Sequence, residues 1–395
     1  MLDRRQWMMA AGAATLTTAA PVLTSARKSG SVTLFLCGDV MTGRGIDQVL
    51  PHPGDPQIHE SYLKSARDYV SLAERRNGPI PKPVDYSYIW GAALAELDRR
   101  RPDVRIINLE TSITRQGDPE PKGIHYRMDP ANVPVLTAAG VDCCVLANNH
   151  VLDWGRAGCI DTLRALRDAG IETAGAGLDA REAERPATLP TPHGRVLVFG
   201  LASSTSGVPG SWAAKTSRPG VELLPDLSSE SADRVGQRIR SLRQEGDIVV
   251  VSIHWGGNWG YQVPSDQRSF AHRLIEEGLV DVIHGHSSHH PKGIEIHRGK
   301  PILYGCGDFI NDYEGIGGYE EYRGDLALMY FLSFDVTDQT LSRLEITPLQ
   351  MTRFQLHRAS TRDCEWIAAS LAREGRALGT TASCVDGDTL RVDLR

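Results

Sequence analysis

Apolar runs of strand length alternate with stretches of helical periodicity through the first 290 residues. Buried strands are predicted at residues 32–37, 104–107, 141–146, 171–174, 195–201, 247–253 and 280–283. Helices are predicted near residues 58–75, 86–100, 130–139, 159–169, 229–244 and 266–277. Because strands that alternate with helices pair most readily in parallel, this pattern favours an α/β core with a mainly parallel sheet.

The pattern changes after Pro291. Strands are predicted at residues 294–297, 302–303, 326–334 and 341–346, with short connections, followed by a helix near 364–373 and a short strand pair. This favours an antiparallel sheet packed on the first. We expect one domain over residues 30–350, with insertions near its site at 51–84 and 203–220, and a C-terminal extension at 351–395 packed on the core. The second insertion carries Trp212 and is expected to form a mobile rim.

The apolar run at 280–283 ends in His284-Gly285-His286-Ser287-Ser288-His289-His290. Neutral imidazole is the commonest metal-ligating side chain, and a glycine after a strand lets the chain turn so that nearby side chains converge. The alternative is a His-rich surface loop.

Four other predicted strands also end in polar clusters. These clusters contain Asp39, Glu110, Asn149 and His150 with Asp153 close by, and His254. If the strands are neighbours in one sheet, the side chains meet in one crevice at its carboxyl edge. Oxygen and imidazole donors together suit Mn, Fe or Zn, so we predict one or two divalent metal ions.

Composition and the N-terminus restrict the function further. The chain has 395 residues and a net charge of −6, and no segment is strongly basic, so nucleic acid is an unsuitable partner. Asp3-Arg4-Arg5-Gln6-Trp7-Met8 precedes an apolar run too short to span a membrane. It predicts a Tat-type export signal over residues 1–29, cleaved near Thr24-Ser25-Ala26 or retained as a membrane anchor, and a periplasmic location. The alternative is a disordered cytosolic tail.

The residues of these clusters and their order along the chain resemble the motifs of the CapA family of poly-γ-glutamate capsule synthesis proteins, within the calcineurin-like metallophosphoesterase superfamily. The matching motifs are Gly38-Asp39-Val40-Met41, Asn108-Leu109-Glu110, Ala147-Asn148-Asn149-His150 with Asp153, His254-Trp255-Gly256, and Gly285-His286 with His289. The resemblance implies a metallophosphoesterase-like sandwich of two mixed β-sheets flanked by helices, with a metal site at the strand ends.

The resemblance also implies a role for each matched residue. His150 would contact the substrate together with Asn149, and His290 is the rival of His289. The implied metal ligands are Asp39, Glu110 as the bridge, Asn149, His254, His286 and His289.

This sequence departs from the family pattern at several positions. Met41 stands where the superfamily usually has a histidine, so one ion would lose a ligand. Glu110 is longer than the usual aspartate, and Asn258 stands near the place of an acid. Ser287 and Ser288 precede the last histidines, and Gly307-Asp308-Phe309 replaces Gly-Asn-Phe.

Three functions remain open. The first is a metal-dependent hydrolase of the cell envelope that acts on a phosphorylated envelope substrate, or on an amide or ester within a capsule-type polymer. The second is a non-catalytic subunit that handles an anionic polymer beside a membrane synthetase in poly-γ-glutamate export, and the third is a plain structural module. Polymer binding would use basic residues around the cleft, for which the candidates are Arg44, Lys122, Arg127, Lys215 and Lys292. Trp154, Trp255 and Trp259 lie near the candidate ligands, where they would stack on a sugar ring or pack in the core.

Overall fold

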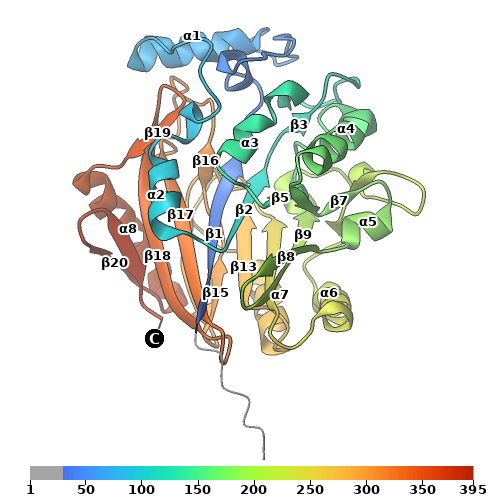
Figure 1. The fold of residues 1–395 in the computed structure, drawn as a ribbon, viewed down its shortest axis with the longest axis vertical. Coiled ribbons are helices and arrows are strands. Elements are labelled where there is room, and N and C mark those ends of the chain that lie inside the picture. The colour runs from blue at the N-terminus through green and yellow to red at the C-terminus, as the bar shows by residue number, and fades with distance from the viewer. Residues whose placement is uncertain (1–29, 395) are drawn as a thin grey trace, which may run out of the picture.

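A computed structural model describes residues 30–394, and the predicted export signal lies outside them. Two large mixed β-sheets pack face to face, with helices on both outer sides (Figure 1). The predicted sandwich of two mixed sheets flanked by helices is therefore confirmed. No helix within residues 30–394 combines the length and apolar character that crossing a membrane requires.

The first sheet is built around β1 (Ser31–Val40). Its strand order is β20-β21-β18-β17-β1-β2-β5-β6, with β16 also paired to β1 and β19 to β18. Strands β1, β2, β5 and β6 run parallel, whereas β17 and β18 continue the sheet antiparallel on the other side of β1. The bounds are β2 (Val104–Leu109), β5 (Cys143–Val145), β6 (Glu172–Ala174), β16 (Asp308–Ile310), β17 (Leu326–Asp335), β18 (Leu341–Thr352), β19 (Gln355–Arg358), β20 (Ala382–Val385) and β21 (Thr389–Val392).

The second sheet has the order β11-β9-β12-β13-β15-β14, with β8 paired to β9. Its centre is parallel, and β8 and β14 are antiparallel additions at the sides. The bounds are β8 (Ala187–Thr191), β9 (Gly194–Ser203), β11 (Leu223–Leu224), β12 (Ile248–His254), β13 (Val282–His286), β14 (Ile294–His297) and β15 (Lys300–Leu303). Four two-residue strands form minor pairs, namely β3 (Ser112–Ile113) with β4 (Arg127–Met128) and β7 (Ala176–Gly177) with β10 (Gly220–Val221).

Eight α-helices complete the described part of the chain. They are α1 (Ala66–Asn77), α2 (Ala92–Arg100), α3 (Pro134–Ala138), α4 (Gly155–Asp168), α5 (Ala180–Glu184), α6 (Ser229–Leu242), α7 (Ser265–Glu276) and α8 (Thr361–Gly375). The predicted helix at 86–100 starts only at Ala92, because Gly91 adopts a φ of 42° and separates it from a short 3-10 turn. Helix α1 lies above the carboxyl ends of the central strands (Figure 1).

The alternation of side chains along β1 explains the layering. Leu34 and Leu36 belong to the core between the two sheets, whereas Phe35 and Cys37 belong to the outer core that α2, α3 and α4 cover. Strand β12 is buried on both faces in the same way: its Val250 faces the inter-sheet core. Its other face packs under α6 and α7. Each fully buried large apolar side chain contributes about 1.5–3 kcal/mol, so this double burial stabilises the centre of the sandwich.

The prediction of a separate antiparallel sheet after Pro291 is wrong. Strands β14 and β15 extend the second sheet, while β17 and β18 extend the first. The parallel strands of each sheet leave an edge with unpaired backbone N–H and C=O groups, and the strands after Pro291 pair with these edges. The segment 203–220 is also anchored: Trp212 is 1% exposed, and its indole Nε1 donates a hydrogen bond to Glu120 Oε2 at 3.2 Å.

One buried ion-pair network ties α2 to the first sheet. Glu96 accepts hydrogen bonds from Thr347 Oγ1 at 2.9 Å and from Arg358 at 2.7 Å, which lie in β18 and β19. Burial alone would raise the pKa of Glu96, but hydrogen bonds from Arg99 and Arg100 outweigh it and lower the pKa to about 2.

We predict that Glu96→Gln lowers the free energy of unfolding by about 2–3 kcal/mol at pH 7. A carboxyl group whose folded-state pKa is depressed stabilises the fold above its unfolded-state pKa, and this stabilisation is lost as the pH falls towards 2. Urea unfolding of the two proteins between pH 7 and pH 2 tests this. The free energies of unfolding of the two proteins should converge as the pH falls towards 2. A difference that stays constant with pH would contradict the depressed pKa of Glu96.

Candidate metal centre

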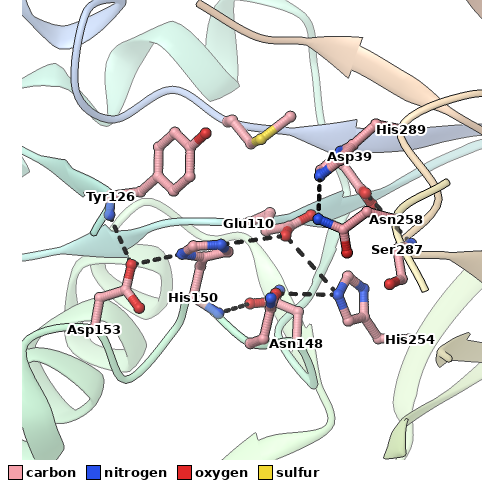
Figure 2. Close-up of polar contacts among 12 residues, drawn as sticks. Asp39, Glu110, Tyr126, Asn148, His150, Asp153, His254, Asn258, Ser287 and His289 are labelled. Carbon is pink, nitrogen blue, oxygen red and sulfur yellow. Dashed lines mark hydrogen bonds and ion pairs between the residues drawn. The ribbon is translucent and has the colours of Figure 1, made fainter. Parts of the chain in front are cut away.

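Carboxylates and imidazoles from both sheets converge at the carboxyl ends of the central strands (Figure 2). Ligand atoms of Asp39, His254 and His286 lie within 4.8 Å of one another, and so do those of Asp39, His289 and Asp308. All five side chains are buried. The side chains meet although the strands are not all neighbours in one sheet, since β1 and β16 belong to the first sheet and β12 and β13 to the second. The site therefore forms where the two sheets meet.

The sheet ladders fix the position of Asp39. It stands opposite Asn108 of β2 and Asp308 of β16, and Asn108 Nδ2 donates a hydrogen bond to Asp39 Oδ1 at 2.7 Å. The preceding residue must be glycine, because a Cβ atom on Gly38 would stand 1.6 Å from the carbonyl oxygen of Gly307. This close approach of two backbones brings the carboxylates of Asp39 and Asp308 to the same place.

His254 and His286 are paired across β12 and β13, and their Nδ1 atoms are 2.8 Å apart. Their rings are tilted by 44° with centroids 5.0 Å apart, an arrangement in which in-plane lone pairs can converge on one point. Burial lowers the pKa of each far below its usual value, with the neighbouring histidines lowering it further. Both imidazoles are therefore neutral near pH 7, which is the form that binds metals. Asn149 Oδ1 lies 3.1 Å from His254 Nε2, which places the predicted amide ligand beside this pair.

His289 lies at the centre, whereas the alternative candidate His290 does not. His289 Nδ1 contacts Asp308 Oδ1 at 2.8 Å, and its Nε2 lies 3.0 Å from Asn258 Nδ2. Burial lowers the pKa of His289, but the Asp308 carboxylate outweighs this and raises it on balance. The ring of His290 instead packs against Trp259, Tyr261 and Tyr322.

Asp308 is the one member of the two groups that the sequence reasoning missed. In the sequence Asp308 stands out only as a departure from the asparagine of the family pattern. A carboxylate between a glycine and a short apolar run is nevertheless a signal that could have found it. Asp39, and not Glu110, is the residue that both groups share. The role of Glu110 as a bridging ligand stays a prediction.

Glu110 supplies the clearest test of whether a cation fits. Its Oε1 lies 3.7 Å from His150 Nε2 and 3.8 Å from His254 Nε2, and its buried Oε2 has no hydrogen-bond partner. Burial, and then the nearby charge of Asp39, raise the pKa of Glu110 well above its usual range. Burial and Asp308 likewise raise the pKa of Asp39 to about 7. Buried carboxylates that repel one another beside neutral imidazoles form a donor set that a divalent cation would complete.

His150 is held from behind by two charged groups. Its Nδ1 lies 2.6 Å from Asp153 Oδ2, and Lys122 Nζ lies 2.7 Å from the other oxygen of Asp153. The backbone amide of Tyr126 donates to the same carboxylate at 2.6 Å (Figure 2). Burial lowers the pKa of His150 to about 4, although Asp153 opposes this. The neutral ring therefore donates a hydrogen bond from Nδ1–H to Asp153 and presents the lone pair of Nε2 to the centre.

A cleft of about 520 Å³ lies beside the centre, and its lining includes His289, Asn258, Tyr126 and Tyr313. Another hollow of about 570 Å³ is lined by none of the candidate ligands. Of the five predicted basic residues only Arg44 lines the cleft, and it is buried in ion pairs with Glu60 and Asp312.

A further histidine and glutamate group, His272, Glu295 and His297, suits a metal less well. The rings of His272 and His297 are stacked, with centroids 3.8 Å apart and planes 5° apart. Because the lone pair of an imidazole lies in its ring plane, two parallel rings do not aim at a common ion. The tilted rings of His254 and His286 can direct their lone pairs at one ion.

This chain is similar to several known proteins. A sequence model of the family described as "Bacterial capsule synthesis protein PGA_cap" matches residues 33–313. A Mycobacterium tuberculosis protein named "Probable polyglutamine synthesis accessory protein" is 51% identical over 88% of this chain and 92% of its own length. "PGA biosynthesis protein CapA" of Bacillus subtilis is 26% identical over 80% of this chain and 70% of its own. A solved structure described as a novel phosphatase from Mycoplasma pneumoniae covers 82% of this chain and 95% of its own at 13% identity, with a TM-score of 0.44.

We predict that the purified wild-type chain retains a divalent metal and that His286→Ala loses it. Removing a ligand should weaken binding by more than the roughly 10–100-fold that removal of an outer partner costs. Elemental analysis after gel filtration measures the metal per chain, and His272→Ala is the matched control from the stacked group. Equal metal in wild type and in folded His286→Ala would contradict the ligand assignment.

We also predict that Met41→His strengthens metal binding. Met41 is fully buried and its sulfur lies 3.6 Å from the Tyr313 hydroxyl, so a thioether stands where the resemblance to the metallophosphoesterase superfamily implies an imidazole. An imidazole is the better ligand for Mn, Fe or Zn. Titration calorimetry with Mn²⁺ should show a lower Kd or an added site in this variant, and Met41→Leu is the control. An unchanged isotherm in a folded Met41→His protein would contradict this prediction.

Proposed function

Since this chain belongs to the bacterial capsule synthesis protein family PGA_cap, we propose that it is a metal-dependent envelope hydrolase of the phosphoesterase type that serves capsule or poly-γ-glutamate synthesis. The family predicted from the motifs is thereby confirmed. One observation carries the hydrolase proposal: two groups of buried ligand atoms share Asp39 and stand beside an oriented His150 at the edge of a cleft.

The chain's own residues fit the requirements of such a site. Asp39, His254 and His286 would hold one ion, and Asp39, His289 and Asp308 a second one, which leaves the number of ions to experiment. When bound, a divalent metal supplies Lewis-acid polarisation of a phosphoryl oxygen and lowers the pKa of water. Mn, Fe and Zn match this mixed set of carboxylate and imidazole donors.

His150 is suited to move a proton at its Nε2 atom. Asp153 accepts a hydrogen bond from Nδ1–H of His150 and so fixes the ring, and the contacts with His150 and Lys122 lower the pKa of Asp153 and keep it ionised. The free Nε2 can accept a proton from an attacking group and return it to the leaving oxygen. Asn149 lies next to it with its amide oxygen on His254, where it can orient the substrate or serve as a ligand.

A second proposal is a non-catalytic subunit that works beside a membrane synthetase on an anionic polymer. The name of the Mycobacterium tuberculosis relative, a synthesis accessory protein, favours it, and so does the thioether of Met41 in place of a ligand. Both proposals are compatible with export by the Tat route to a periplasmic location, for which the twin arginines Arg4 and Arg5 are the support.

We predict that the metal-loaded protein hydrolyses bis(4-nitrophenyl) phosphate and that EDTA abolishes the reaction. His150→Ala should lower kcat by about 10²–10⁴-fold, the usual contribution of a positioned acid or base, while metal content stays unchanged. His272→Ala, from the stacked group away from the cleft, is the control and should react as wild type does. A fully loaded wild type that cleaves no phosphoester would remove the hydrolase proposal and leave the accessory subunit.

A further inference from the structure

Most of the exposed large hydrophobic side chains among the described residues line the cleft beside the metal centre. Among residues 30–394, five large hydrophobic side chains are exposed, and Tyr62, Ile316 and Tyr319 line this one cleft. Exposed apolar groups that cluster at a hollow mark a binding site more often than scattered ones do. The cleft therefore offers more than access to the metal centre.

A row of aromatic rings leads from the centre to solvent. The ring of Trp259 lies 5.4 Å from that of His289, and Tyr319 stacks on Trp259 with centroids 3.9 Å apart and planes 2° apart. Tyr319 is still 48% exposed, so its ring is supported on one side and available on the other. Such a supported, exposed ring is a surface on which the apolar face of a sugar can rest.

Amide side chains stand among these rings. Asn77, Asn258 and Gln350 line the cleft, and each gives an N–H to a protein partner, namely Glu314, His289 and Asp325. Their amide oxygens accept no hydrogen bond from the described residues. Free carbonyl acceptors beside aromatic rings match the hydroxyl donors of a carbohydrate.

The charges of the lining do not suit a polyanion. Three arginines, Arg44, Arg76 and Arg323, face three acids, Glu314, Glu320 and Asp325, within the lining. Two of the arginines are already paired with acids: Arg44 with Glu60 and Asp312, and Arg323 with Asp325 and Asp363. A chain with a carboxylate on every residue needs an excess of positive charge, which this cleft lacks.

We propose that this cleft is a carbohydrate subsite, and that the substrate of the metal centre carries an uncharged sugar ring next to its phosphoester. Poly-γ-glutamate is then not the molecule that occupies the cleft. The statement about the reaction rests on the proposed hydrolase function, whereas the statement about binding does not.

Kinetics on two substrates of equal charge test the proposal. Wild type should hydrolyse glucose 1-phosphate with a kcat/KM about 3- to 10-fold above that of the ring-free glycerol 1-phosphate, the factor that one aromatic contact supplies. Tyr319→Ala should lose this preference without slowing glycerol 1-phosphate, and Tyr319→Phe should keep it. Leu178→Ala, an exposed apolar residue outside the cleft, is the matched control.

Binding is measured separately by saturation-transfer NMR with methyl glucoside and with hexa-γ-glutamate. We expect transfer to the glucoside that depends on Tyr319, and none that depends on Tyr319 to the glutamate oligomer. The opposite pattern, or an equal loss of both phosphate reactions in Tyr319→Ala, would overturn the carbohydrate subsite. If neither of these phosphates nor bis(4-nitrophenyl) phosphate is cleaved, the hydrolase proposal fails, and the glucoside measurement still decides the subsite. If only bis(4-nitrophenyl) phosphate is cleaved, the statement about the substrate is overturned.

Discussion

The structure depends on holding negatively charged groups together where water is excluded. Asp39, Glu110 and Asp308 are almost fully buried at the ends of neighbouring strands, and burial and mutual repulsion raise the pKa values of the first two. Such a cluster opposes folding unless its charge is compensated. The sheet ladders around it fix the backbone, so the compensation must come from a bound cation or from shared protons.

Surrounding side chains make this arrangement rigid. Asn108 donates to Asp39, and Asn148 donates to the Asn108 side chain while its own oxygen accepts the backbone amide of His150. The same chain of contacts thus joins a candidate ligand to the candidate proton carrier. On the other side, the Arg44 guanidinium stacks on Tyr69 at 3.6 Å and bonds to Tyr126, whose ring packs edge-on against His150. A site supported on both sides keeps its geometry for chemistry or for tight binding.

The enzyme proposal and the accessory-subunit proposal are supported by different residues of this site. The oriented pair of His150 and Asp153 has no evident purpose in a passive polymer carrier, because burying a histidine and a carboxylate costs free energy. Met41 offers a thioether in place of the expected imidazole, while the two groups of carboxylate and imidazole donors stand without it.

The sequence alone determined the order of strands and helices and most of the centre. Apolar runs that end in Asp39, His254 and His286 predicted the strands and marked these residues as candidate ligands, because ligands bind at the carboxyl ends of strands in α/β folds. Only the tertiary structure decided which strands share a sheet, that Asp308 joins the centre, and that His289 and not His290 faces it. These facts depend on contacts between segments hundreds of residues apart, such as Gly38 with Gly307, and no local pattern of residues records them.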